Sequence, residues 1–221
     1  MPQLLIADDH PLYRMALCQA ARGLGDDVAV AEADSLDAAL AALAQRPDTD
    51  LVLLDLHLPD SHGLMGLAAV RAEHPSVAVL MISAHDDPAT VRRALAYGAM
   101  GFIPKRAGLD ELQRALRTVL DCGDWLPEPL RAAVAATSAS VQDRELAARL
   151  AQLTPQQFRV LALVAEGRLN KQIADALGIS ERTVKAHLSA IFDKLGVGNR
   201  TSAGVLLRTL ELVDPAQRLQ E

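Results

Sequence analysis

Acidic side chains, one serine and one lysine follow short apolar runs in the first half of this 221-residue sequence. They are Asp8 and Asp9 after LLIA (4–7), Asp55 after LVLL (51–54), Ser83 after VAVLMI (77–82), and Lys105 two residues after MGFI (100–103). If the carboxylates lie together, they need a cation or a proton to offset their charge, and oxygen ligands suit Mg²⁺. An ammonium and a hydroxyl can bind phosphoryl oxygens. These residue types are therefore suited to phosphoryl transfer onto Asp55.

Taken one at a time, these residues have simpler explanations. An aspartate after a strand is most often a helix cap or a turn residue, and Asp9 in front of HPLYRMAL is a candidate for that role. A single lysine is most often solvated. The set as a whole favours a common site, because its members follow successive apolar runs in order.

The apolar runs alternate with segments whose apolar residues recur at helical spacing, for example Leu36, Leu40 and Leu43. Five strands are predicted, at 4–7, 28–33, 51–54, 77–82 and 100–103. Such units, apolar on both faces of the sheet, predict an α/β fold with a doubly wound, five-stranded parallel sheet. Functional groups in these sheets collect beyond the carboxyl ends of the strands, so the acidic residues should share one edge.

The pattern changes after residue 120. Residues 122–151 begin with Gly and Pro and then become rich in Ala, which predicts a linker that is partly helical. No strand pattern follows, and helices are predicted at 154–166, 170–177, 181–195 and 201–212. The predicted organisation is an α/β domain at 1–121, the linker at 122–151, a small all-α domain at 152–213 and a tail at 214–221.

Charge is distributed unevenly along the chain. Residues 1–120 contain 10 Lys and Arg against 16 Asp and Glu, whereas residues 153–213 contain 8 against 5. The small basic part is therefore expected to meet a polyanion. Half of the residues are apolar, which argues against disorder. No apolar run reaches the roughly 18 residues of a membrane span, so a cytoplasmic protein without a membrane partner is predicted.

Residues 170–195 have the pattern of two helices joined by a tight turn. The first helix is predicted to stop at Gly178, and the second to begin after Ser180, a favourable N-cap. This pattern predicts a helix-turn-helix whose second helix enters a DNA major groove. The polar residues left on the second helix are Arg182, Thr183, Lys185, His187, Ser189 and Lys194. The alternative is an ordinary helical hairpin with a solvated basic face.

Four segments carry a resemblance to one family. ADDH (7–10), LLDLHLPDSHGL (53–64), MISAH (81–85) and GFIPK (101–105) resemble the receiver domain of two-component response regulators. The resemblance covers residues 3–120 and implies a flavodoxin-like fold with Asp55 as the phosphoacceptor. The other roles it implies are Mg²⁺ binding by Asp8, Asp9, Asp55 and the backbone carbonyl of His57, phosphoryl binding by Ser83 and Lys105, and switching by the aromatic Phe102.

Two histidines stand where the receiver family varies. His57 and His85 follow Asp55 and Ser83 at a distance of two residues, and their side chains are expected to flank the pocket. An alternative use is a zinc site made from His57, His62 and His85.

The C-terminal segment resembles the LuxR-type DNA-binding domain over residues 152–212, and TVKAHLSAIFDKLGVGNR (183–200) follows the family motif nearly residue by residue. The resemblance implies two groups of DNA contacts. Lys185, Ala186 and Ser189 lie towards the bases, and Thr183, His187, Lys194 and Arg200 lie towards the backbone. Gln156 and Gln157 replace an Arg-Glu pair of the family, so the salt bridge that braces the first helix is expected to be absent.

A receiver followed by this domain is the organisation of the NarL/FixJ class of response regulators. The resemblance implies a transcription regulator in which a sensor histidine kinase phosphorylates Asp55. The new charge is expected to draw Ser83 and Phe102 inward and to change dimerisation and binding of double-stranded DNA. A homodimer on two half-sites is expected in the active state, and RNA polymerase is a candidate partner. The protein is not expected to be an enzyme.

Two alternatives remain open. An aspartyl-nucleophile phosphatase would also use a doubly wound sheet, but its first strand would be followed by a DxD motif rather than by the adjacent Asp8 and Asp9. A regulator that binds DNA without phosphorylation would use the receiver only as a dimerisation module.

Overall fold

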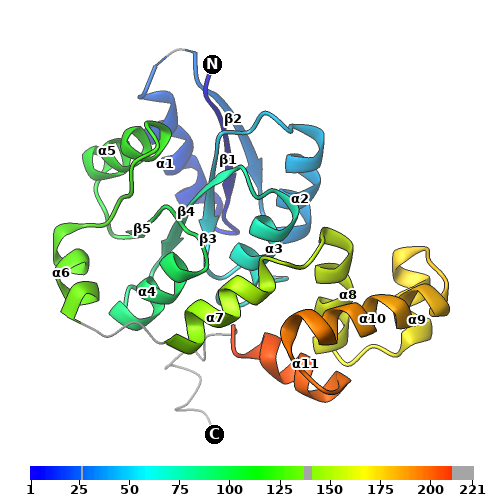
Figure 1. The fold of residues 1–221 in the computed structure, drawn as a ribbon. Helices are drawn as coiled ribbons and strands as arrows, with labels where there is room; N and C mark the ends of the chain where they lie inside the picture. The colour runs from blue at the N-terminus through cyan, green and yellow to red at the C-terminus, as the bar shows by residue number, and fades with distance from the viewer. Residues whose placement is uncertain (26, 137–140, 211–221) are drawn as a thin grey trace, which may run out of the picture.

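The first half of the chain folds into one parallel sheet covered by helices (Figure 1). The computed structural model describes residues 1–25, 27–136 and 141–210. Its five strands lie in the order β2-β1-β3-β4-β5. They are β1 (Gln3–Ala7), β2 (Ala29–Ala33), β3 (Leu51–Asp55), β4 (Ala78–Ser83) and β5 (Gly101–Pro104). The predicted doubly wound α/β fold is confirmed, and each strand lies within one residue of its prediction at either end.

Helices cover both faces of the sheet. They are α1 (Pro11–Arg22), α2 (Leu36–Gln45), α3 (Met65–Glu73), α4 (Pro88–Ala96) and α5 (Leu109–Leu120). One hydrophobic cluster holds α1 and α5 against one face, and a second cluster holds α2, α3 and α4 against the other. The strands are therefore apolar on both sides, as helices on both faces of a parallel sheet require.

β3 lies at the centre of the sheet, and all five of its residues are buried. Its parallel register sets Leu54 opposite Ala7 of β1 and Asp55 opposite Ile82 of β4. Asp8, the residue after Ala7, therefore leaves the sheet at the same edge as Asp55. In β3 the first polar residue is Asp55, where the chain leaves the core.

The segment between the two halves is helical and packs on the sheet domain. It contains α6 (Glu128–Ala136) and α7 (Val141–Leu150), and both helices pack against α4. Before α6, Trp125 forms a parallel bridge with Gly101 of β5. The linker is thus attached to the free edge of the sheet.

The C-terminal part contains α8 (Pro155–Ala165), α9 (Asn170–Leu177), α10 (Glu181–Leu195) and α11 (Arg200–Arg208). The first three match the predicted helices within one residue, and α11 begins one residue before its prediction. The helix ends at Arg208, before its predicted end at 212, and Thr209 and Leu210 form a turn. The predicted tail at 214–221 lies outside the described residues. Among the helices that are described, none is both long and apolar enough to cross a membrane.

The C-terminal helices dock on the α3 and α4 side of the sheet domain (Figure 1). The Arg159 guanidinium of α8 donates to both carboxylate oxygens of Glu73, at 2.8 and 2.5 Å. The guanidinium of Arg93 in α4 donates to Asp143 of α7 at 3.1 Å and also to the carbonyl of Thr209. One continuous hydrophobic cluster runs from the sheet through both linker helices into α8, α10 and α11.

Asp60 caps α2 from the loop after β3. Its carboxylate accepts hydrogen bonds from the amides of Leu36 at 2.7 Å and Asp37 at 2.9 Å, the first two residues of the helix. Asp60→Ala should lower the free energy of unfolding by about 1 kcal/mol, because two amides at a helix N-terminus lose a charged acceptor. Urea unfolding followed by circular dichroism measures this change. Asp48→Ala, an exposed aspartate before β3, is the control, and equal losses in both variants would contradict the capping role.

Candidate functional site

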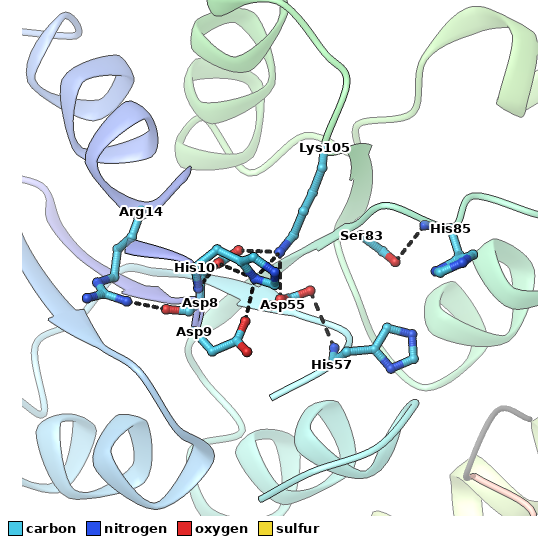
Figure 2. A network of polar contacts seen from close by, with 9 residues as sticks. All are labelled: Asp8, Asp9, His10, Arg14, Asp55, His57, Ser83, His85 and Lys105. Carbon is cyan, nitrogen blue, oxygen red and sulfur yellow. Dashed lines mark hydrogen bonds and ion pairs between the residues drawn. The ribbon is translucent and has the colours of Figure 1, made fainter. Parts of the chain in front are cut away.

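Three aspartates and Lys105 meet at the carboxyl edge of the sheet (Figure 2). The Nζ atom of Lys105 lies 2.7 Å from Asp55 Oδ2 and 2.8 Å from Asp8 Oδ2. Asp8 and Asp55 are 0% and 4% exposed, and Asp9 is half-buried. The structure thus brings together the charged residues that the sequence places after three different strands.

Hydrogen bonds from backbone amides fix Lys105 and Asp55 at the ends of their strands. The amide of Lys105 donates to the carbonyl of Ser83 at 2.7 Å, which ties the residue after β5 to the last residue of β4. The amide of His57 donates to Asp55 Oδ1 at 3.3 Å. Asp55 therefore has one oxygen facing a backbone amide and the other facing the lysine.

Electrostatics at this edge favour a cation. Burial raises the pKa of Asp55, and the Asp8 carboxylate raises it further, although the hydrogen bond from Lys105 opposes both effects. Burial lowers the pKa of Lys105, but the interactions with Asp55 and Asp8 outweigh burial and leave that pKa above its ordinary value. The lysine therefore remains charged. The Lys105 ammonium faces two carboxylates, Asp8 and Asp55, and the carboxylate of Asp9 lies close by, so a divalent cation would offset the excess of negative charge.

The atoms that could hold such an ion lie close together. One oxygen or nitrogen from each of Asp8, Asp9, His10 and Asp55 lies within 4.8 Å of the others. Carboxylate oxygens are the ligands that Mg²⁺ prefers, so the residues present fit that ion.

The histidines do not form the alternative zinc site. The rings of His57 and His85 meet edge to face with their centroids 5.8 Å apart. His62 belongs to no group of three potential metal-binding side chains in the described part of the chain. The interpretation of these three histidines as zinc ligands is therefore wrong, because the third ligand is not brought to the pair.

Sequence reasoning missed three residues of the first turn of α1 that border the pocket. His10 is the N-cap of the helix, and its Nδ1 lies 2.5 Å from Asp9 Oδ1, so Asp9 itself does not cap α1. Arg14 donates to a backbone carbonyl of the pocket at 2.5 Å. The Nζ atom of Lys105 lies 5.1 Å from the centre of the Tyr13 ring. The segment HPLYR (10–14), directly after Asp8 and Asp9, could have indicated these residues. Tyr13 and Arg14 lie three and four residues after His10, and residues at this spacing share a helix face.

Ser83 and Phe102 lie deeper than the charged residues. Ser83 is fully buried, and its Oγ accepts a hydrogen bond from the His85 amide at 3.0 Å. Phe102 is also 0% exposed and belongs to the same hydrophobic cluster as Val91 and Ala94 of α4. The Phe102 ring therefore lies in the core in this conformation, and its movement on phosphorylation stays a prediction.

The helix-turn-helix predicted in the C-terminal part is present as α9, a tight turn and α10. Gly178 ends α9 in the left-handed conformation, with φ 63°. Ser180 then caps α10 by accepting a hydrogen bond from the Thr183 amide at 3.1 Å. The buried side of α10 consists of Val184, Leu188, Ile191 and Leu195. Its opposite side exposes Arg182, Lys185, Ala186 and Ser189, with Thr183 and His187 half-buried.

Two candidate DNA contacts are used inside the helical domain. The ammonium of Lys194 donates to Gln157 Oε1 at 2.7 Å and to the carbonyl of Gln152 at 2.9 Å. The guanidinium of Arg200 donates to Asn170 Oδ1 at 3.1 Å and to the carbonyl of Arg168. Both cations therefore help to hold α10 and α11 in place, and their contacts with DNA stay predictions.

Gln157 makes hydrogen bonds in place of the family's salt bridge, which the sequence predicts to be absent. Its Oε1 accepts from the Thr154 amide at 3.1 Å while the Gln157 amide donates to Thr154 Oγ1 at 3.3 Å, which makes a capping box at the start of α8. The same oxygen accepts from Lys194. A brace between α8 and α10 is thus kept without a carboxylate.

A receiver-like sheet with an acidic pocket, joined to an exposed helix-turn-helix, defines a DNA-binding transcription regulator. The response regulator receiver domain family matches residues 4–117, and the luxR family of bacterial regulatory proteins matches residues 151–207. The chain therefore belongs to the two-component response regulators that carry a LuxR-type DNA-binding domain, as the sequence motifs predicted.

Known relatives align over nearly the whole chain. The glycerol metabolism activator of Pseudomonas putida is 41% identical over 92% of this chain and 93% of its own. The nitrate/nitrite response regulator protein NarL of Escherichia coli K12 is 32% identical over 91% and 93%. Among solved structures, RcsB of Salmonella enterica serovar Typhimurium, bound to promoter P1flhDC in the presence of phosphomimetic BeF3-, has a TM-score of 0.54 at 24% identity, covering 93% of this chain and 97% of that chain. This last likeness supports the fold.

Gln157→Glu should stabilise the helical domain. The new carboxylate would stand 2.7 Å from the Lys194 ammonium and in the first turn of α8, where negative charge is favourable. The expected gain is about 0.5–1 kcal/mol in the free energy of unfolding. Gln156→Glu adds the same charge to the same helix turn, so the difference between the two variants isolates the contribution of Lys194. Chemical denaturation measures both, and equal gains would contradict the proposed brace.

Proposed function

We propose that Asp55 accepts a phosphoryl group from a sensor histidine kinase and that the modified receiver controls DNA binding by α10. The observation that carries the proposal is the Lys105 ammonium, 2.7 Å from Asp55 and 2.8 Å from Asp8 in a buried pocket with excess negative charge. Family membership supports it, because the chain combines a receiver with a DNA-binding domain. On this proposal, residues 1–121 receive the signal, 122–151 link the domains, and 152–213 bind DNA.

The chemistry is one transfer between two nucleophiles. An oxygen of Asp55 attacks the phosphorus of a phosphohistidine on the kinase; the O–P bond forms as the P–N bond breaks, and the imidazole nitrogen keeps the electron pair. Lys105 and the hydroxyl of Ser83 bind oxygens of the transferred group. Mg²⁺ held by Asp8, Asp9, Asp55 and the backbone carbonyl of His57 would supply positive charge to the phosphoryl oxygens.

DNA recognition uses the exposed side of α10. Lys185, Ala186 and Ser189 are the exposed residues of α10 that face the bases. Lys185 is the main candidate for reading them, because Ala186 and Ser189 are small. Arg182, Thr183 and His187 reach the DNA backbone, where basic and hydroxyl groups bind phosphates. Lys194 and Arg200 act indirectly, because their internal hydrogen bonds hold the recognition helix in position.

The proposed partners follow from this mechanism. The active protein is a homodimer in the cytoplasm that binds double-stranded DNA with two half-sites, and RNA polymerase is its proposed target at promoters. It is a regulator without turnover of its own, so hydrolysis of a phosphomonoester in the presence of Mg²⁺ should not be detectable.

One observation favours a second candidate function. The recognition face of α10 is already exposed while the helical domain is docked on the sheet domain, so the receiver does not cover it. A regulator that binds DNA without phosphorylation would have this property. The experiment on Asp55 below separates the two candidates.

Mg²⁺ should stabilise the wild-type protein against heat. Binding to the native state adds about 1.4 kcal/mol when the ion is present at about ten times its Kd. Asp9→Asn should gain much less, because it removes a carboxylate of the pocket that faces His10 rather than Lys105. Thermal unfolding in Mg²⁺ and in EDTA measures both proteins, with Asp48→Asn as the control for loss of a surface charge. A wild-type Tm that does not respond to Mg²⁺ would speak against the metal site.

Acetyl phosphate should phosphorylate the wild-type protein but not Asp55→Asn, as read from phosphate-affinity gels. Genome-wide binding-site sequencing should then show lower occupancy for Asp55→Asn. Lys185→Ala should lose about tenfold or more in affinity for the recovered duplexes, because one base contact contributes about 1–3 kcal/mol. Arg117→Ala, an exposed change on α5, is the control. Equal occupancy of wild type and Asp55→Asn would favour the second candidate.

A further inference from the structure

β5 is an edge strand of the sheet, and a short piece of the linker covers its free side. We call residues 124–126 the strap. The Trp125 amide donates to the carbonyl of Met100 at 3.0 Å, and the Phe102 amide donates to the carbonyl of Trp125 at 3.1 Å. The strap thus pairs in parallel with the edge strand at Gly101, the first residue of β5, at the end of the strand away from the pocket.

Gly101 is the residue that permits this approach. A Cβ atom at Gly101 would lie 2.3 Å from the carbonyl oxygen of Trp125, closer than any side chain allows. The obstacle is backbone, which cannot rotate out of the way as a flexible side chain can. Any larger residue at Gly101 would therefore push the strap away from β5.

The strap also touches the residue that phosphorylation is expected to move. Phe102 is fully buried, so its ring has no exposed surface through which to contact another domain. Its backbone amide, however, is bonded to the strap. Three residues after Phe102, Lys105 closes the acidic pocket, and its own amide is bonded to the carbonyl of Ser83. A displacement of β5 therefore changes the strap directly.

Beyond the strap, the chain leads to the recognition helix. α6 begins at Glu128, and its Leu130 is buried in the same hydrophobic cluster as Phe102. α6 and α7 pack against α4, and α7 packs against α10. At the end of α7, the Arg149 guanidinium donates to the carbonyl of Leu195, the last residue of α10, at 3.0 Å. Positive charge at this position also suits the C-terminus of a helix.

We propose that the strap couples β5 to the DNA-binding domain, with Trp125 as a positioning residue whose backbone holds Phe102 and whose chain continues into the linker helices. The inference rests on the proposed phosphoryl transfer to Asp55 and adds the route by which its effect leaves the receiver. The strap contains none of the residues that are proposed to bind Mg²⁺ or the phosphoryl group. Breaking its pairing with β5 should therefore leave phosphorylation of Asp55 intact and remove only the response of DNA binding.

The test compares the affinity for a recovered DNA duplex before and after treatment with acetyl phosphate. A coupling of about tenfold is expected for the wild type, within the range of typical linked equilibria. Gly101→Ala should reduce it to about twofold or less while the rate of Asp55 phosphorylation stays close to that of the wild type. Gly108→Ala is the matched control, since a Cβ there meets nothing within 4 Å.

A second pair of variants covers the case in which Gly101→Ala folds poorly, because a Cβ there would also lie 2.9 Å from the side chain of Leu80. Trp125→Pro removes the amide that bonds to Met100 and should lose the coupling. Trp125→Phe keeps the backbone bonds and should retain it. Trp125 is the single tryptophan of the chain, so its fluorescence should change on phosphorylation of the wild type and not of Gly101→Ala.

The outcomes distinguish the inference from the proposed function. A wild type that takes up no phosphoryl group on Asp55 would overturn both. Phosphorylation of the wild type without any change in DNA affinity would overturn the coupling and, with it, the control of DNA binding in the proposed function. Full coupling in phosphorylated Gly101→Ala or Trp125→Pro would also overturn the strap, because the response would then leave the receiver by another route.

Discussion

The ammonium of Lys105 lies between the carboxylates of Asp8 and Asp55. Its positive charge allows these two buried carboxylates to lie close together at the carboxyl edge of the sheet. Like charges in a buried place repel strongly, and burial alone already raises the pKa of Asp55. The lysine offsets part of this repulsion but not all of it. The remaining negative charge favours a divalent cation, and such a cation would in turn offset the charge of phosphoryl oxygens.

The pocket can exist only at the end of strands that are apolar on both faces. β3 is buried along its whole length between two hydrophobic clusters, so Asp55 is the first residue at which a charge can reach solvent. Parallel register then brings Asp8 to the same edge, and β5 delivers Lys105 from the far side of β4. The reactive geometry is therefore a consequence of how the core is packed.

The two domains share one hydrophobic cluster, yet the recognition face of α10 stays open. This arrangement does not match a mechanism in which the receiver controls DNA binding by covering the recognition face of α10. Ion pairs between Glu73 and Arg159 and between Arg93 and Asp143 hold the helical domain on α3 and α4, next to the linker helices. On the proposed route, changes in the receiver reach α10 through the linker helices that pack on α4.

The sequence by itself determined the strands, the helix-turn-helix and the residues of the pocket, because hydrophobic period, caps and strand-end polar residues are local signals. Only the tertiary structure decided that Phe102 is buried, that His57, His62 and His85 form no group of metal ligands among the described residues, and that Lys194 braces α8. The pairing of Trp125 with Gly101 likewise appears only in the fold. Such contacts join residues far apart in the chain, and their partners are chosen by packing and register, which no local spacing records.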